Sequence, residues 1–378
     1  MKPKFIIYSL FLIIIMWGCV QDDTIQITPE IAKLTDKWAP DVEQQLMQEL
    51  RQMENAINEP APRAGRIVTV PAGSVDALAL AIAQAGEGGL VFLRAGEHRE
   101  SGTVTITQRV RILGEKGAVL ISETQPLPPS NLIQPAIHVL NAPGTSITGL
   151  ALRPAGNVGG TGILLENSDG SRIFNCNISD YQFGILNEQS NEATMFLNTI
   201  ASSPLWQTGE VELVFGITNI NGDRVRIVGN TISNSLQGIF ACDDDGLCSS
   251  NKLNNNLIGL LICRVPENVI PLPQGNLTGA ENSGNGWTVR NNFANGNFDV
   301  GYLVIDGANH NLLINNFASN NVRVDYEIAG ESERFGFLTP LAFENEVFAK
   351  PGQTVKDCGE DNVVHGGVKI DTAADPCF

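Results

Sequence analysis

Basic residues and histidines are scarce in this chain. Its 378 residues include 24 Lys and Arg against 41 Asp and Glu, which gives a net charge of −17. So acidic a surface argues against nucleic-acid binding, which needs clustered Lys and Arg. It also disfavours a polyanionic glycan unless a local basic pocket exists. The acidity by itself is typical of a soluble protein surface.

Signatures of metal and nucleophile chemistry are also missing. The histidines are scattered and show no paired spacing: His98, His138, His310 and His365. A structural zinc site needs four converging ligands, so this pattern argues against one. There is no Gly-rich phosphate loop, no Gly-x-Ser-x-Gly elbow and no Cys/His nucleophile pair. We therefore expect no metal and no cofactor, with calcium at clustered acids as the alternative.

One hydrophobic run stands out, at the N-terminus. Lys2 and Lys4 precede the apolar segment Phe5–Trp17, which is followed by Gly18 and Cys19. The run is too short for a comfortable membrane span and resembles a bacterial lipoprotein signal. The resemblance implies a signal peptide over residues 1–18 and a mature chain that starts at acylated Cys19.

The acids just after Cys19 indicate a location. Gln21-Asp22-Asp23 resembles the surface-export signal of Bacteroidetes lipoproteins, which implies a lipid-anchored protein on the outer-membrane surface. Removal of residues 1–18 deletes two Lys and no acid, so the mature charge is 22 − 41 = −19.

A tether is predicted over residues 19–65. Within residues 28–58 the apolar side chains recur every three or four residues, which predicts an amphipathic helix. They are Trp38, Val42, Leu46, Leu50, Met53 and Ile57. The segment Glu59–Gly65 then breaks the helix and serves as a linker. The helix either holds the next domain off the membrane or docks on it; we favour docking, because so long an apolar stripe is costly in water.

A repeat begins near residue 160. Five of its units open with Gly and a short apolar strand, and an Asn follows that Gly 13–15 residues later. The glycines are Gly162, Gly184, Gly216, Gly238, Gly259 and Gly301; the Asn row is Asn177, Asn198, Asn230, Asn251, Asn292 and Asn315 or Asn316. Units of about 21–22 residues cannot bury their own apolar faces, so they must stack. The longer gaps between glycines predict insertions near residues 203–214 and 264–286.

The repeat resembles the right-handed parallel β-helix family, which includes the pectin-lyase-like proteins. The segment Val70–His98 matches the family's first coil, in which a short helix closes the open end of the solenoid. Ala77, Leu78, Ala81 and Ile82 would form the buried face of that helix. The resemblance implies an all-β solenoid over residues 66–378 with a C-terminal cap. This fold hosts many functions, so function must come from a site.

Exported proteins can form disulfides. Besides Cys19 the chain has Cys176, Cys242, Cys248, Cys263, Cys358 and Cys377. Cys242 and Cys263 each lie four residues after a repeat Gly, so they should stack on successive coils within disulfide reach. Cys248 competes for Cys242 through a small loop; we favour Cys242–Cys248, with Cys263 left over. Cys358–Cys377 would close the C-terminal tail, and Cys176 is expected to be a small buried hydrophobe.

Alternation along each strand separates an inner row from an outer row. If Ile163, Ile185, Ile217 and Ile239 face the core, the outer row is Leu164, Leu186, Thr218, Phe240, Leu261 and Leu303. An outer row this apolar predicts that something covers it. The candidates are the two insertions, the N-terminal helix and a partner protein.

The fifth residue after each Gly gives the candidate site. Asp243, Arg264 and Asp306 follow one another in that row, and Asp244 extends the cluster. Carboxylates near an Arg are a candidate acid/base pair, cation site or sugar clamp. Glu166 and Glu188 form a second stacked pair, with a spacing that fits retaining glycoside hydrolysis. The alternative for both pairs is a solvated turn with ordinary charges.

Two functions remain open. The first is a surface lipoprotein whose β-helix binds or scaffolds extracellular glycan or an envelope protein. The second is a carbohydrate-active enzyme, a polysaccharide lyase or glycoside hydrolase, centred on Asp243, Asp244, Arg264 and Asp306. The motifs that mark polygalacturonase-like enzymes and alginate epimerases are absent, which favours the first. An open groove at this row, with Trp206 or Trp287 on its wall, would favour the second.

Overall fold

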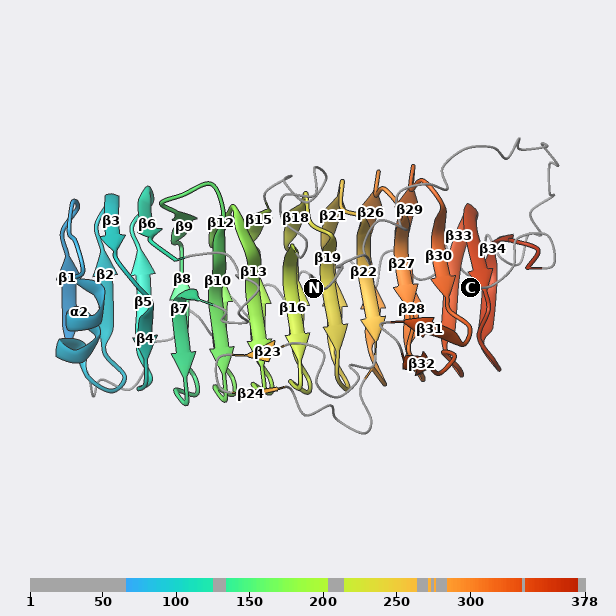
Figure 1. The fold of residues 1–378 in the computed structure, drawn as a ribbon, viewed down its shortest axis with the longest axis horizontal. Coiled ribbons are helices and arrows are strands. Elements are labelled where there is room, and N and C mark those ends of the chain that lie inside the picture. Colours follow the sequence, from blue (N-terminus) through green and yellow to red (C-terminus); the bar gives the residue numbers. More distant parts are fainter. Residues whose placement is uncertain are drawn as a thin grey trace, which may run out of the picture.

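The computed structural model describes residues 66–124, 134–202, 214–263, 271–272, 275–276, 284–334 and 337–372. Figure 1 shows an elongated stack of parallel coils, with the chain advancing from one end of the stack to the other. The predicted signal peptide, the tether and Cys19 lie outside the described residues. Within the described part of the chain, no helix is long and apolar enough to cross a membrane.

Each coil presents up to three strands to three faces of the solenoid. Face 1 carries β4 (Val104–Ile106), β7 (Pro135–Leu140), β10 (Gly159–Glu166), β13 (Tyr181–Glu188), β16 (Phe215–Ile220), β19 (Gln237–Cys242), β22 (Ile258–Cys263), β27 (Val300–Val304) and β30 (Val324–Ile328). Face 2 carries β1 (Ile67–Val70), β2 (Leu90–Leu93), β5 (Arg111–Gly114), β8 (Ser146–Thr148), β11 (Arg172–Phe174), β14 (Thr194–Phe196), β17 (Arg226–Val228), β20 (Leu247–Ser249), β25 (Thr288–Arg290), β28 (Leu312–Ile314) and β34 (Val363–Lys369). Face 3 is a separate sheet of β3 (Gly96–Glu100), β6 (Ala118–Ser122), β9 (Ala151–Pro154), β12 (Asn177–Ser179), β15 (Thr199–Ala201), β18 (Thr231–Ser233), β21 (Lys252–Asn254), β26 (Phe293–Asn295) and β29 (Phe317–Ser319).

Three elements complete the description. The long strand β33 (Glu346–Asp357) pairs with β28, β30 and β34. Two small antiparallel hairpins join β23 (Pro271–Leu272) to β24 (Gly275–Asn276) and β31 (Ser332–Arg334) to β32 (Phe337–Thr339). All pairings between coils are parallel and in register, which confirms the predicted all-β solenoid.

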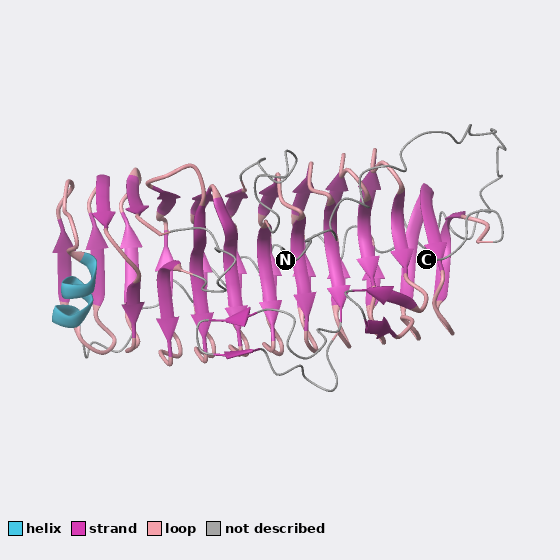
Figure 2. Ribbon diagram, viewed as in Figure 1, coloured by secondary structure: helices cyan, strands magenta, loops and turns pink. Residues whose placement is uncertain are grey.

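Helix α2 (Leu78–Ala85) closes the N-terminal end of the solenoid, as predicted. It is the only helix among the described residues and lies over the first coils in Figure 2. Leu78, Ala81 and Ile82 are buried in the core, and Ala77 packs against it. The helix begins where the Glu100 carboxylate accepts hydrogen bonds from the Ala77 and Leu78 N–H groups, at 3.1 and 2.9 Å. That carboxylate caps the N-terminus of the helix.

The predicted inner and outer rows of face 1 are confirmed. The inner isoleucines, from Ile163 to Ile239, belong to the main core. The leucines of the outer row belong to a second cluster, which we call the outer apolar cluster: Leu164, Phe183, Leu186, Phe215, Ile220, Cys242, Leu261, Cys263, Val300, Leu303, Ile305, Val324 and Ala329. Phe240 of the outer row is partly buried and packs against this cluster, and Thr218 is a buried polar residue outside it. The side chains of the cluster are buried, as a covered face requires. The predicted covering segments lie wholly or largely outside the described residues.

The repeat glycines allow coils to approach closely. A Cβ on Gly184 would lie 2.6 Å from the Gly216 carbonyl oxygen and 2.6 Å from Ile200 Cγ2. Gly162 faces the Gly184 carbonyl oxygen in the same way, also at 2.6 Å. Any larger residue would push neighbouring coils apart, so the Gly row follows from packing.

The Asn row forms a continuous hydrogen-bond ladder inside the turns between faces 2 and 3. The side-chain amide of Asn198 donates to Asn230 Oδ1 at 3.0 Å, and the pattern continues to Asn251, Asn292 and Asn316. Asn316, one of the two predicted alternatives, is the last member. One detail differs from the prediction: the first place belongs to Cys176, whose N–H donates to Asn198 Oδ1. Asn177 points outward because it already begins β12.

The favoured Cys242–Cys248 disulfide is wrong. Cys242 is bonded to Cys263, because β19 and β22 pair in register and bring the two Cα atoms to 4.9 Å on the outer side of face 1. Cys248 lies on β20 and points into the core, where it is a free thiol like Cys176. Cys358 is disulfide-bonded. Cys377 lies outside the described residues, so the Cys358–Cys377 pairing stays a prediction.

We predict that Asn251→Ala destabilises the protein by about 2–5 kcal/mol, because it removes the buried hydrogen bonds that the Asn251 side chain makes with Asn230, Asn292 and Ile227. Thermal unfolding followed by circular dichroism measures the loss. The matched control is Asn177→Ala, outside the ladder and in register with Ala151 of the preceding coil. Equal melting temperatures for the two variants would contradict the ladder's role.

Candidate functional site

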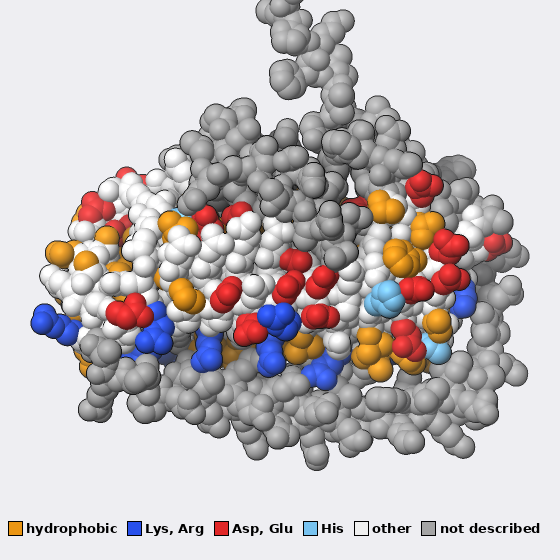
Figure 3. Space-filling view, turned by 90° about the horizontal axis from the view of Figure 1, so that it is seen from below, with side chains coloured by type: hydrophobic (Ala, Val, Ile, Leu, Met, Phe, Trp, Pro, Cys, Tyr) orange, Lys and Arg blue, Asp and Glu red, His pale blue; other side chains and the backbone are white. Residues whose placement is uncertain are grey.

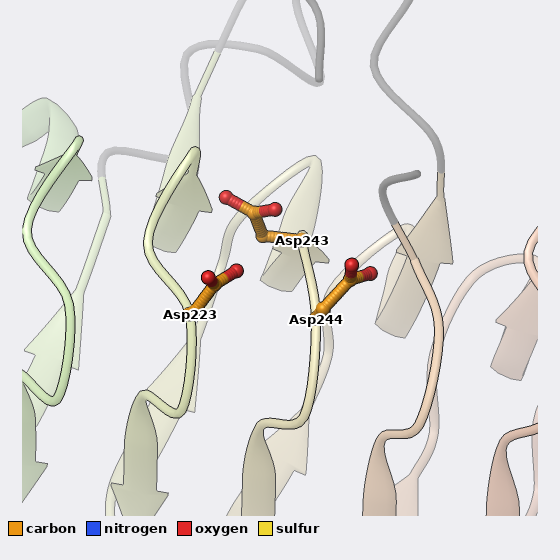
Figure 4. Close-up of side chains that lie close together, drawn as sticks. All are labelled: Asp223, Asp243 and Asp244. Atoms are coloured by element: carbon orange, nitrogen blue, oxygen red, sulfur yellow. The ribbon is translucent and has the colours of Figure 1, made fainter. Parts of the chain in front are cut away.

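Three carboxylates meet in the turns between faces 1 and 2. Asp223 lies in the turn between β16 and β17, and Asp243 and Asp244 lie in the next turn, between β19 and β20 (Figure 4). One oxygen of each carboxylate lies within 4.8 Å of the other two. Asp243 is only 4% exposed, while Asp223 and Asp244 are half-buried. We call this group the Asp cluster.

Two carboxyl groups of the Asp cluster, those of Asp243 and Asp244, have raised pKa values. Burial, reinforced by the neighbouring charges of Asp223 and Asp244, raises the pKa of Asp243 to about 7. Burial also raises the pKa of Asp244, opposed by a hydrogen bond that its carboxylate accepts from the Asn285 N–H at 3.1 Å. Three carboxylates this close repel one another unless a proton or a cation intervenes. The cluster is therefore suited to hold either one near neutral pH.

The turn geometry explains why Asn and Asp recur in the row that contains Asp243. Asn167, Gln189, Asn221 and Asp306 have φ between 47° and 59°, whereas Asp243 itself has a φ of 128°. Asn and Asp tolerate this left-handed conformation better than most residues. The row of charges that the sequence indicates is thus a row of turns, and only part of it carries the cluster.

The structure brings together two of the four predicted site residues. Asp243 and Asp244 lie in the cluster, whereas Asp306 lies two coils beyond Asp243 in the same row. Arg264 lies outside the described residues. Asp223 was missed, because the turn after β16 is one residue longer than the turn after β19, which shifts Asp223 level with Asp244. A count of turn lengths against strand registers would have found it.

Trp287 does not form the groove wall that would have favoured the enzyme hypothesis. Its side chain is fully buried in the main core, and its indole Nε1 donates a hydrogen bond to the Asp243 carbonyl oxygen. The indole therefore holds the backbone of the Asp cluster from the core side. Trp206 lies outside the described residues.

The second predicted pair is stacked as expected, on the outer side of face 1. Glu166 and Glu188 are register partners on β10 and β13, and both are buried. A third residue, His138 on β7, was missed: its Nε2 lies 2.7 Å from Glu166 Oε2. Glu188 forms no side-chain hydrogen bond or ion pair with the described part of the chain. Burial, followed by the charge of Glu166, raises the pKa of Glu188 to about 7.

The chain matches a known family model over its regular coils. Residues 135–318 match the model described as the right handed beta helix region. Together with the stacked parallel coils, this identifies the fold as a right-handed parallel β-helix, as the repeat predicted. A search of curated proteins finds no match.

Solved structures are similar in fold. ORF18 of Geobacillus virus E2 is 13% identical with a TM-score of 0.50, over 80% of this chain and 60% of that chain. An alginate lyase from Paenibacillus sp. str. FPU-7 is 14% identical with a TM-score of 0.46, over 81% and 98% of the two chains. PfbA, a surface adhesin of Streptococcus pneumoniae, is 11% identical with a TM-score of 0.47, over 78% and 88%. The similar structures thus include both an enzyme and an adhesin, and identities this low bear on the fold alone.

We predict that Glu188→Gln stabilises the protein more at pH 8 than at pH 5, with a difference of roughly 1–2 kcal/mol. Between about pH 4 and pH 7 the unfolded chain loses the Glu188 proton while the folded protein keeps it, so the free energy of unfolding falls as the pH rises. Glutamine has no proton to lose. Denaturant unfolding across this pH range measures the effect, with the exposed Glu192→Gln as the control. A pH-independent difference would contradict the shifted pKa.

Proposed function

We propose that this chain is a lipid-anchored protein of the outer-membrane surface whose β-helix binds extracellular glycan through a divalent cation held by the Asp cluster. The observation that carries the proposal is the convergence of the Asp223, Asp243 and Asp244 carboxylates within 4.8 Å. The N-terminal features, Lys2, Lys4, the apolar run and Cys19, support the location. Membrane and glycan, or an envelope protein that carries glycan, are the partners proposed.

The ligand chemistry favours calcium. Carboxylate oxygens are hard ligands, and Ca²⁺ accepts six to eight of them in flexible geometry. Three monodentate carboxylates fill part of that shell, which leaves positions for water or for glycan hydroxyl and carboxylate oxygens. The half-buried Asp223 and Asp244 place those positions toward the surface of the turn region. The bound cation also removes the repulsion that raises the pKa of Asp243.

We predict that about 10 mM calcium chloride stabilises the wild-type chain by roughly 1–3 kcal/mol at pH 8 and by less at pH 6, because Asp243 must lose its proton to bind the cation. Asp243→Asn should abolish the calcium effect. The matched control is Asp169→Asn in the turn between β10 and β11, where the amide oxygen can still accept the hydrogen bond from the Asn191 N–H. Thermal unfolding with and without EDTA measures the shifts.

Glycan binding is tested separately on a glycan array. The wild-type chain should retain a glycan in calcium and lose it in EDTA, and Asp243→Asn should not retain it. If no glycan on the array depends on both calcium and Asp243, the role of the Asp cluster is refuted. No binding to any glycan in either condition would refute the function.

One observation favours a second candidate function, a carbohydrate-active enzyme. A buried carboxyl with a pKa of about 7 is available as a general acid at neutral pH, and Asp223 and Asp244 lie beside it as candidate bases. A glycan-panel degradation assay with wild type and Asp243→Asn tests this. We expect the enzyme to lose at least 100-fold in rate on this change, since general acid catalysis contributes roughly that much or more. Equal rates would rule out Asp243, and no product from any glycan would rule out the enzyme.

A further inference from the structure

A ladder of arginines runs along the outer side of face 2. In successive coils the same register position holds Arg111, Ser146, Arg172, Thr194 and Arg226. Their strand neighbours Ile112, Ile173 and Ile227 belong to the core, so these side chains point outward. Because neighbouring strands lie about 4.8 Å apart, the arginines recur about every 9.6 Å, and small hydroxyl residues fill the places between them.

The ladder places positive charges in a row on a chain whose net charge is −17. Figure 3 shows Lys and Arg side chains recurring along the solenoid beside a band of Asp and Glu. Two arginines nearest the acids form ion pairs: Arg109 with Glu87 and Arg224 with Glu192, at 3.3 and 3.2 Å. The ladder arginines come two residues later in each coil. The side chains of Arg111 and Arg226 form no hydrogen bond or ion pair with any described residue, so their charges remain available.

The surface is hollowed at one end of the ladder. A pocket of about 430 Å³ is lined by Arg224, Arg226, Asp245 and Leu247. Arg226 and Leu247 are register partners on β17 and β20, so the pocket continues the ladder position. Two residues after the ladder position, on the same outer side of the strands, lie the exposed Leu113 and the half-buried Phe174. Charged guanidinium groups beside apolar side chains match a sugar polymer, whose rings offer both anionic groups and C–H faces.

We propose that face 2 binds a linear anionic glycan that lies along the solenoid axis and carries one acidic group on every second sugar. An extended glycan advances by nearly one coil spacing for each sugar ring, so alternate sugars come level with Arg111, Arg172 and Arg226. Guanidinium groups bind carboxylate or sulfate with paired hydrogen bonds, and Ser146 and Thr194 leave room for the neutral sugars between. The ligand class extends the proposed glycan function and rests on it, but the residues are separate from the Asp cluster.

Charge spacing makes the proposal selective. A polymer with an acid on every sugar would place half of its charges opposite Ser146 and Thr194, near the acidic band and without a cation. Hyaluronan has one carboxylate for each disaccharide, whereas polygalacturonate has one on every sugar, so the two distinguish spacing from total charge. Dextran is the neutral reference, and single-stranded oligothymidylate tests for a general polyanion.

The experiment measures binding of these four polymers to the full chain on a biosensor at several salt concentrations. The variants are Arg111→Ser, Arg172→Thr and Arg226→Thr, which introduce the residue types that neighbouring coils already hold at this position. The control is Lys252→Thr, which removes an exposed cation from face 3 at a position in register with Thr231. Cooperative thermal unfolding of every variant verifies folding, and the single changes keep the test meaningful if the triple variant does not fold.

We expect hyaluronan to bind more tightly than the other three polymers. Each single arginine change should weaken its binding by about 2- to 5-fold and the triple change on the order of 10- to 100-fold, with a shallower dependence on salt. Lys252→Thr should leave it unchanged, and the losses in the arginine variants should be the same with and without EDTA, which separates this site from the Asp cluster. Equal binding of hyaluronan and dextran, tighter binding of polygalacturonate or oligothymidylate, or equal losses in Lys252→Thr and the arginine variants would each overturn the proposal.

Discussion

In-register stacking of coils about 4.8 Å apart is the constraint on which the rest of this structure depends. Every backbone position on the three faces has a register partner one coil away, and side chains on it meet their counterparts directly. Glycine is needed where the coils touch, as at Gly184 against the Gly216 carbonyl. Asn is needed inside the turns, because one amide can donate to one neighbour while its oxygen accepts from the other. The sequence is periodic because each coil must make the same contacts with its neighbours.

Because the coils stack in register, the behaviour of each charged side chain depends on the residues at the same position in the neighbouring coils. Like charges in register repel, and the chain shows three different outcomes. Glu166 gains a partner in His138, while Glu188 and Asp243 have pKa values raised to about 7 by burial and adjacent carboxylates. Arg111, Arg172 and Arg226 avoid repulsion because Ser146 and Thr194 separate them. The order of residues along one register position therefore decides whether a charged side chain of the solenoid is paired, has a shifted pKa or is separated from like charges.

The candidate site was predictable in part. The row of Asp243 and its neighbour Asp244 could be read from their distance to the repeat glycine, since residues within one strand keep that register. Asp223 and His138 could not, because their contacts depend on the length of a turn and on a strand in an earlier, less regular coil. The disulfide shows the same division. The spacing placed Cys242 opposite Cys263, but only the inward direction of Cys248 on β20 excluded the competing bond.

The sequence alone determined the solenoid, its capping helix, the inner isoleucine row and the outer apolar row. These features follow from the periodicity of the sequence. The sequence is periodic because each coil buries its apolar face in the same way. The tertiary structure alone decided which charges meet. The Asp cluster joins two turns of unequal length, the His138–Glu166 pair joins neighbouring coils, and the arginine ladder spans coils whose residue counts differ. Contacts of this kind depend on where each coil closes, which is set by three-dimensional packing and not by distance along the chain.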